Sequence, residues 1–277
     1  MDNYKIINFH QIFSENCFCL SKRLGIEIIT NFEPKEGHTY IVFGAHEQAI
    51  QLSVAQLRQK NFNYIIMNSE PPLSQFLKNR YYISLMRSNV VFDYHESSAD
   101  YLTSLGIRVL NKFIFEFVFS PTPAERDVDI MFIGSISDRR KAIYESLVKR
   151  YPSKKIVFHF NWNLTNHHEL TKELQRAKVV LNIPYHNHNI LETHRINKAL
   201  SCGCNVVSLY SGHKETDDFY SKYVYFCHDL FEYFDTEDML PDVKPEPKLD
   251  YRHLIGELNK YTSQMKWILE KMNEVNI

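Results

Sequence analysis

The sequence predicts an α/β fold built on parallel sheets. Short apolar runs with strand character alternate with amphipathic segments along the whole chain, and the length of 277 residues suffices for two ordinary domains. Such alternation favours parallel sheets, because each parallel pair of strands needs a crossover that is usually a helix. With 44% hydrophobic and 23% charged residues, the composition is that of a globular chain.

The first half contains apolar runs that are each followed by a segment of helical periodicity. The predicted strands are 4–9, 27–30, 40–43, 64–67, 90–93 and 108–110, and the predicted helices are 13–24, 49–60, 71–87 and 98–105. A proline-bearing connector, Phe119-Ser-Pro-Thr-Pro-Ala, interrupts this pattern. We therefore expect an N-terminal domain of residues 1–122.

The alternation restarts after the connector. The predicted strands are 130–133, 156–160, 179–183, 205–209 and 224–227, and the predicted helices are 139–150, 167–176, 191–201, 215–221, 230–234 and 251–275. The last helix has a single apolar stripe, which favours packing against a core. We expect a second domain of residues 123–250, followed by a helical segment of residues 251–277.

Charge and cysteine usage exclude several classes of protein. The net charge of −1 gives no basic footprint for nucleic acid. Five cysteines, an odd number that includes two Cys-x-Cys pairs, do not fit a secreted disulfide framework. The first residues lack an apolar signal core, and no window is apolar enough to span a membrane. We expect a cytoplasmic protein, and no pattern indicates its oligomeric state.

The segment 182–208 is the richest in polar groups at a loop-to-helix junction. A buried strand leads into the polar loop 185–189, a helix follows, and Gly203 ends it before the next strand. Glu192 and Arg195 are three residues apart, so both face the same side of that helix. Polar side chains beside the ends of a parallel sheet are where α/β proteins place ligands.

A second polar junction follows the strand at 129–133. Gly134 can let backbone N–H groups approach an anion, and Arg139 or Arg140 can hold phosphate oxygens in a bidentate manner. The alternative is an ordinary strand–turn–helix with solvated arginines. The presence of the Glu192 and Arg195 pair in the same half of the chain favours a phosphate site.

Polar residues also end several strands of the first half, and strand ends point into the ligand crevice of such sheets. Glu70, Asp93 and His95 are candidates for that crevice, and His10, which ends the first strand, is with Glu70 and His95 a candidate general base. A lone histidine at a strand end is often simply hydrogen-bonded or solvated, which is the alternative for each of them.

These motifs resemble those of a known fold family. The run Arg195-Ile-Asn-Lys-Ala-Leu-Ser-Cys-Gly203, followed by Val206-Val-Ser, resembles the donor half-site of GT-B glycosyltransferases of the glycosyl transferase family 1 and CgeB-like types. The Gly134 turn resembles the start of the same half-site, and the runs 64–71 and 91–98 resemble the N-terminal half of these transferases more loosely. The resemblance implies two Rossmann-like domains facing a cleft, with the C-terminal helix packing back.

The resemblance implies transfer of a monosaccharide from a UDP- or GDP-linked sugar to a glycan, lipid or protein hydroxyl, with no other cofactor and without a bound metal. The residues that it implies for donor binding are Gly134, Ser135, Arg139, Arg140, His188, Glu192, Arg195 and Lys198. Lys198 stands where the family usually has the glutamate that holds the donor ribose, and Glu192 could supply a carboxylate instead. The alternatives are a catalytically inactive GT-B-like binding or scaffolding protein, and a sugar-phosphate epimerase of similar shape.

Three further patterns have weaker functional interpretations. Asp127-Val-Asp129 matches the sequence of a metal-binding Asp-x-Asp motif, but it precedes its strand and so lies at the wrong end of the sheet. The histidines of 167–194, with Cys202 and Cys204, suggest zinc, although their spacings differ from those of zinc sites. Tyr81, Tyr82 and the phenylalanines at every second position of 113–119 make an aromatic-rich area. The alternating phenylalanines indicate a strand with one buried face, and a membrane-facing patch, with peripheral membrane contact, is the alternative.

Overall fold

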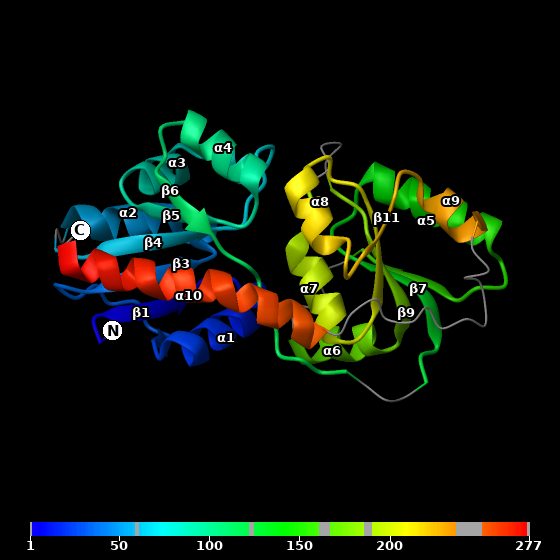
Figure 1. The fold of residues 1–277 in the computed structure, drawn as a ribbon. Coiled ribbons are helices and arrows are strands. Elements are labelled where there is room, and N and C mark those ends of the chain that lie inside the picture. Colours follow the sequence, from blue (N-terminus) through cyan, green and yellow to red (C-terminus); the bar gives the residue numbers. More distant parts are fainter. Residues whose placement is uncertain are drawn as a thin grey trace. The chain divides into compact units, whose positions relative to one another are not determined.

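The computed structural model describes residues 2–58, 61–121, 125–160, 167–185, 190–236 and 251–275. The chain divides into two compact units (Figure 1). Unit 1 comprises Met1–Glu116 together with Gly256–Ile277, and unit 2 comprises Phe117–Ile255. Each unit is a parallel sheet with helices, so the predicted α/β class is confirmed.

Unit 1 is built on a sheet with the strand order β2-β1-β3-β4-β5-β6. Its strands are β1 Tyr4–Asn8, β2 Glu27–Ile29, β3 Thr39–Phe43, β4 Asn63–Asn68, β5 Val90–Asp93 and β6 Val109–Lys112. Its helices are α1 Ser14–Leu24, α2 Ala49–Arg58, α3 Arg80–Arg87, α4 Glu96–Ser104 and most of α10 Tyr251–Val275. Short 3-10 turns occupy Gln11–Phe13, Ala45–Gln48 and Gln75–Lys78.

Residues 71–87 are mostly helical, as predicted, but they form two separate elements rather than one helix. The α-helix begins only at Arg80, after the 3-10 turn at Gln75–Lys78. Two prolines at 71 and 72 remove backbone donors, and the Asn79 side chain accepts the Tyr81 N–H at 2.9 Å to cap a new helix.

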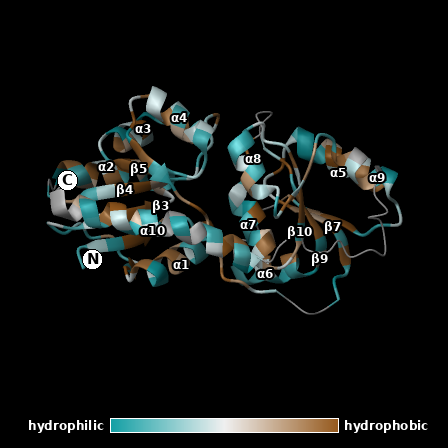
Figure 2. Cartoon of the chain, viewed as in Figure 1, coloured by the Kyte–Doolittle hydropathy of each residue, from teal (hydrophilic) through white to brown (hydrophobic). Residues whose placement is uncertain are grey.

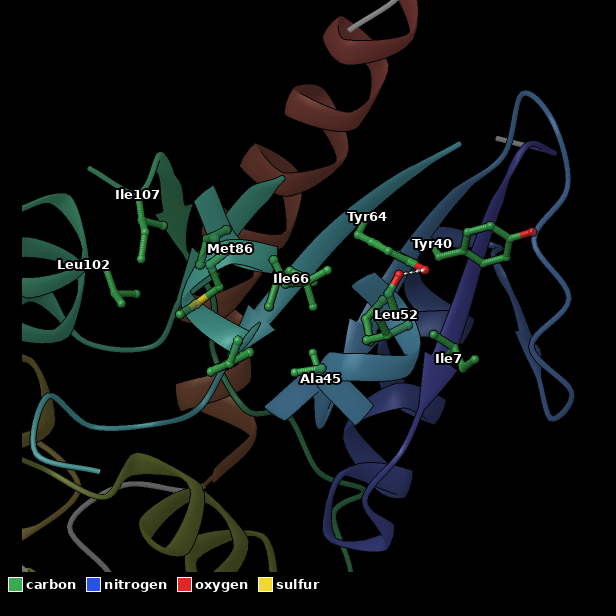
Figure 3. Packing of buried hydrophobic residues seen from close by; sticks show 14 of the residues in the cluster. Ile7, Tyr40, Ala45, Leu52, Tyr64, Ile66, Met86, Leu102 and Ile107 are labelled. Carbon is green, nitrogen blue, oxygen red and sulfur yellow. Dashed lines mark hydrogen bonds between the residues drawn. The ribbon is translucent and has the colours of Figure 1, made fainter. Parts of the chain in front are cut away.

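Side-chain alternation along the strands of unit 1 builds a core on each face of the sheet. On one face, Ile7 and Ile66 pack against α2, α3 and α4, and the Tyr64 hydroxyl donates to the Leu52 carbonyl at 3.2 Å (Figure 3). On the other face, the Tyr4 hydroxyl donates to the Leu269 carbonyl of α10 at 3.0 Å. The terminal helix is thereby tied to the first strand of unit 1.

Unit 2 is built on a sheet with the strand order β11-β10-β9-β7-β8. Its strands are β7 Val128–Ile133, β8 Ile156–His159, β9 Ala177–Asn182, β10 Asn205–Leu209 and β11 Tyr225–Cys227. Its helices are α5 Asp138–Arg150, α6 His167–Gln175, α7 Thr193–Ser201, α8 Lys214–Tyr220, α9 Leu230–Thr236 and the first residues of α10. The strands of both sheets are largely brown in Figure 2, as expected where both faces are covered. Among the described helices, none has both the length and the apolar character that crossing a bilayer requires.

The predicted strand at 113–119 is wrong, although its burial pattern is informative. β6 ends at Lys112, and although the Phe113 N–H still donates to the Asp93 carbonyl of β5 at 2.8 Å, residues 113–121 are not part of a strand. Phe113, Phe115 and Phe117 are nevertheless only 4%, 2% and 3% exposed. An extended chain places alternate side chains on one side even when it joins no sheet. Because these three rings are buried, they do not form the membrane-facing patch considered as the alternative.

Both sheets have the same switch in strand order. β1 lies between β2 and β3, and β7 lies between β8 and β9. In each unit the second strand is therefore added on one side of the first strand, and the third strand is added on its other side. Ligands of open parallel sheets bind beyond the carboxyl ends of the strands at this point. The expected ligand sites are therefore the carboxyl ends of β1 and β3 in unit 1 and of β7 and β9 in unit 2.

Candidate functional site

In unit 2, a carboxylate held between two arginines occupies the β7/β9 switch point. Glu192 lies at the start of α7, and its Oε1 accepts from Arg140 Nη2 at 2.8 Å. Its Oε2 lies 2.5 Å from Arg195 Nη2, so Glu192 and Arg195 do share one side of the helix, as their spacing predicted. The Tyr185 N–H also donates to Oε1 at 2.9 Å. The carboxylate is thus fixed from several directions.

Arg140 is a buried residue that positions Glu192. It is 1% exposed, its Nε and Nη2 donate to the Ile183 carbonyl at 3.0 and 2.6 Å, and its Nη1 donates to the Ser135 carbonyl at 2.8 Å. Burial lowers the pKa of Arg140 to about 10, which still leaves it charged at neutral pH. Most of its donors serve the protein, so its guanidinium ties the end of β9 to the turn after β7.

Arg195 is more accessible and retains hydrogen-bonding capacity. Its Nε donates to the Ile133 carbonyl at 2.8 Å, its Nη1 donates to Asn182 Oδ1 at 2.9 Å, and its Nη2 pairs with Glu192. A guanidinium has five N–H donors, so within the described residues two remain for a ligand. The side chain is 13% exposed. It is a fixed cation at the carboxyl edge of the sheet.

Gly134 makes room for both guanidinium groups. A Cβ at this position would lie 2.8 Å from Arg195 Nη2 and from Phe132 Cζ, and 3.2 Å from Arg140 Nη1. The Gly134 N–H donates to the His159 carbonyl at 3.1 Å, so it is used within the sheet rather than presented to an anion. The two predicted walls of the site, the glycine turn and the acid–guanidinium pair, therefore lie in direct contact.

The charge balance of this cluster suits an anion. Two guanidinium groups and one carboxylate leave a net charge of one positive unit. The half-buried Arg139 lies in the first turn of α5, beside the helix start that Ser137 caps by accepting the Arg140 N–H at 3.3 Å. A helix N-terminus and arginine donors both favour phosphate or carboxylate groups. We name Arg140, Glu192 and Arg195 the arginine cluster.

Two predicted donor-binding residues have different surroundings. Lys198 is 2% exposed, and its Nζ lies 5.3 Å from the centroid of the Phe117 ring. This is the geometry of a cation–π contact within unit 2. His188 lies outside the described residues, as does His186.

In unit 1, two histidines flank the β1/β3 switch point. Gly44 has φ +69°, and a Cβ there would lie 2.9 Å from the His10 backbone nitrogen, so only glycine allows this close approach. His46, two residues further on, is 8% exposed. Its Nδ1 lies 3.5 Å from Glu70 Oε1, and its Nε2 lies 3.5 Å from Glu47 Oε1. Burial, with a smaller effect of His10, lowers the pKa of His46 to about 4.

Sequence reasoning did not select His46 as a site residue. The signal that could have found it was present, because Gly44-Ala-His directly follows a strand just as His10 does. Because its pKa is about 4, His46 is neutral at pH 7, and it lies beside the Glu70 carboxylate.

The two predicted histidine bases both serve as caps of the helical turns that follow them. His10 Nδ1 accepts the Ile12 N–H at 3.2 Å, and His95 Nδ1 accepts the Ser97 N–H at 3.3 Å. A neutral imidazole has one acceptor nitrogen, so in this arrangement the proton resides on Nε2. Each ring can then donate a hydrogen bond but does not offer a free base. This geometry favours the hydrogen-bonded alternative for both.

A buried network fixes Glu70 and the ends of β4 and β5. Asp93 is 0% exposed and accepts from Asn68 Nδ2 at 2.7 Å, from Ser98 Oγ at 3.0 Å and from the His95 N–H at 3.0 Å. Burial raises the pKa of Asp93 to about 6 and also raises the pKa of Glu70. The Ser74 hydroxyl donates to Glu70 Oε2 at 2.5 Å. Glu70 is thus oriented with its other oxygen toward His46.

The aspartates of the Asp-x-Asp spelling form ion pairs at the amino end of β7. Asp127 pairs with Arg176 at 2.9 Å and with Lys155, and Asp129 pairs with Lys178 at 2.7 Å. Over the described ranges, no group of three or more His, Cys, Asp or Glu side chains is placed to share a metal ion. Cys204, of the suggested zinc set, instead donates its Sγ–H to the Leu174 carbonyl at 3.0 Å.

Comparisons with solved structures place the fold. The chain is similar to TarM, with 14% identity over 86% of this chain and 54% of TarM and a TM-score of 0.51. It is also similar to sucrose-phosphate synthase from Thermosynechococcus elongatus, with 13% identity over 86% of this chain and 74% of that one, at the same TM-score of 0.51. The chain thus spans about half the length of TarM. Comparison with family models and with curated proteins finds no match.

At these identities the likeness concerns the fold. It is the two-unit fold of GT-B glycosyltransferases, so the fold that the motifs resembled is confirmed.

Proposed function

We propose that the chain is a glycosyltransferase that moves a monosaccharide from a nucleoside-diphosphate sugar to a hydroxyl of a glycan, lipid or protein. The observation that supports it most is the arginine cluster, which puts a net positive charge at the switch point of unit 2. The fold agrees with this proposal, because the solved structures that it resembles are those of GT-B glycosyltransferases.

On the donor side, the reaction must stabilise a diphosphate as it leaves the sugar. The two N–H donors that Arg195 retains, together with Arg139, would neutralise the developing charge without a bound metal. These donors are preorganised, since Ile133, Asn182 and Glu192 already hold the Arg195 guanidinium in place. Little reorganisation would be needed during transfer.

Glu192 would hold a donor hydroxyl. Its carboxylate is 27% exposed and is held in a fixed position by the two arginines. This residue would supply the carboxylate that the family usually places at position 198. Lys198 itself is buried against Phe117 and would support the helix.

On the acceptor side, we assign the base to the pair of His46 and Glu70 for a reaction that inverts configuration. With the His46 Nδ1–H toward Glu70, the Nε2 lone pair, which lies 3.5 Å from Glu47 Oε1, would take the proton of an acceptor hydroxyl. Burial keeps the ring neutral at pH 7, and its pKa of about 4 also makes it a weaker base than an ordinary histidine. In a retaining reaction, the leaving phosphate would accept that proton instead. His10, with its proton on Nε2, would donate a hydrogen bond to the acceptor.

Turnover with a panel of UDP- and GDP-linked sugars tests this proposal. Release of nucleoside diphosphate should occur with at least one donor, and Arg195→Ala or Glu192→Ala should lower kcat by about 10²–10³-fold, as for other oriented charge-stabilising groups. Lys141→Ala, a change at an exposed position of α5, serves as the matched control. Binding without turnover for every donor would instead support the inactive GT-B-like scaffold, an alternative favoured by the lysine at position 198.

A further inference from the structure

The outer face of α2 is apolar although it is exposed. Ile50, Val54 and Leu57 are 55%, 39% and 79% exposed and follow one another at helical spacing. The opposite side of the same helix places Leu52 in the core at 0% exposure. A surface helix normally has polar residues opposite its buried face. Packing within unit 1 therefore does not explain why the outer stripe of α2 is apolar.

Helix α3 packs beside α2 and extends this surface with aromatic and basic groups (Figure 1). Tyr81 is 39% exposed, and the guanidinium of Arg80 lies 4.9 Å from the centroid of its ring. Lys78 precedes the helix and is exposed, whereas the Arg87 guanidinium at the end of the helix donates to the Leu105 carbonyl after α4 at 3.0 Å. We call the surface formed by Ile50, Val54, Leu57, Arg58, Lys78, Arg80 and Tyr81 the α2–α3 face.

The charge of this region differs from that of the whole chain. Residues 48–92 contain the basic residues Arg58, Lys60, Lys78, Arg80 and Arg87, whereas Glu70 is the one acidic residue in that stretch of sequence. The Glu70 carboxylate is 14% exposed and faces His46 and Ser74. The exposed Glu47 directly precedes this stretch and the buried Asp93 follows it, so basic residues outnumber acidic ones around α2 and α3, whereas the chain as a whole has a net charge of −1.

We propose that the α2–α3 face binds the surface of an anionic lipid bilayer. Exposed aliphatic side chains and a tyrosine would enter the interface between headgroups and acyl chains. The surrounding Lys and Arg side chains can extend their charged ends to lipid phosphates while their stems stay in apolar contact. Both features, an apolar patch and a rim of one charge sign, match a negatively charged membrane. The proposal is independent of the chemistry assigned to unit 2.

Co-sedimentation with vesicles tests the proposal on the full chain. Vesicles of phosphatidylcholine alone are compared with vesicles of equal parts phosphatidylcholine and phosphatidylglycerol. The chain should bind the second kind and not the first. Raising the salt from about 0.1 M to about 1 M shortens the Debye length from about 10 Å to about 3 Å and should release most of the bound protein.

Substitutions locate the surface. Lys78→Gln and Arg80→Gln should each lower the partition coefficient about fivefold. Leu57→Ser should lower it at least as much, because its side chain is the most exposed apolar group of the face. Lys141→Gln and Val148→Ser make the same kinds of change at exposed positions of α5 in unit 2 and should leave binding unchanged. All of these sites are exposed, and circular dichroism confirms that the variants fold.

Failure of the wild-type chain to bind phosphatidylglycerol vesicles would overturn the proposal. Equal binding to both kinds of vesicle would do so as well, since the charge complementarity would then have no effect. Binding that the α5 variants weaken as much as the α2 and α3 variants would assign the contact to another surface.

Discussion

Gly134 and Arg195 are packed so closely that a methyl group on the glycine would lie 2.8 Å from the Arg195 guanidinium. This contact joins the end of β7 to the first turn of α7. The glycine is therefore required for space, and the arginine has a position that the sheet itself defines.

Gly134→Ala tests this contact. We expect a loss of about 1–3 kcal/mol in the free energy of unfolding, as for other insertions into tight packing, together with weaker nucleotide binding because the guanidinium must move. Urea denaturation measures the first effect. Gly256→Ala is the control, since a Cβ there meets nothing within 4 Å and lies in α10, where alanine favours the helix. Equal effects of the two substitutions would show that Gly134 is not sterically constrained.

The Arg140–Glu192 pair should show strong energetic coupling. We expect Arg140→Gln and Glu192→Gln each to destabilise the fold by about 1–3 kcal/mol, because Glu192→Gln leaves the buried Arg140 charge without its carboxylate and Arg140→Gln leaves the Ile183 and Ser135 carbonyls without their donor. In a double-mutant cycle, the coupling free energy should be about 1–3 kcal/mol. The exposed pair Lys141–Glu145, 3.9 Å apart, provides a comparison that should stay below about 1 kcal/mol. Additive effects at Arg140 and Glu192 would contradict the positioning role of Arg140.

His46 should make the fold less stable in acid. In the unfolded chain a histidine takes up its proton near pH 6.5, whereas burial lowers the pKa of folded His46 to about 4. Between these values the unfolded state binds more protons, so the stabilisation by neutral His46 is complete above about pH 6.5 and is lost as the pH falls toward about 4. The loss amounts to about 3 kcal/mol at most.

The comparison of His46→Gln with the wild type isolates this effect. Asp93 has the opposite sign, because its raised pKa of about 6 means that the folded state gains stability as the pH falls through that range. The difference between the two unfolding free energies, measured by urea denaturation from pH 4 to pH 7, cancels the Asp93 contribution. That difference should shrink as the pH falls. Parallel profiles would contradict a neutral, buried His46.

Local patterns predicted most of the fold. Each apolar run that was assigned to a strand of the two sheets forms one, and the connector before residue 122 follows closely on the change between units. The exceptions have local causes. Two prolines at 71 and 72 delay α3 until Asn79 caps it, and the phenylalanines of 113–119 alternate in an extended segment that is not itself a strand.

The candidate site was less accessible to sequence reasoning, because burial and long-range contacts decide what each residue can do. The spacing of Glu192 and Arg195 was enough to predict their pairing. No spacing predicts that Arg140, 52 positions before Glu192, donates to its carboxylate, or that the other Arg140 donors bind backbone carbonyls. Similarly, the pairing of His46 with Glu70 depends on the neighbouring strands β3 and β4. Both contacts, Arg140 with Glu192 and His46 with Glu70, depend on which strands are neighbours in the sheet, and local sequence patterns do not predict that order.

Calorimetric titration of the full chain with UDP and GDP tests the central claim most directly. We predict saturable binding of at least one of them, weakened about 10–100-fold in Arg195→Gln through the loss of charge-assisted hydrogen bonds, and unchanged in Lys141→Gln. If neither nucleotide binds the wild-type chain, or if Arg195→Gln binds as tightly as the wild type, the arginine cluster is not a diphosphate site.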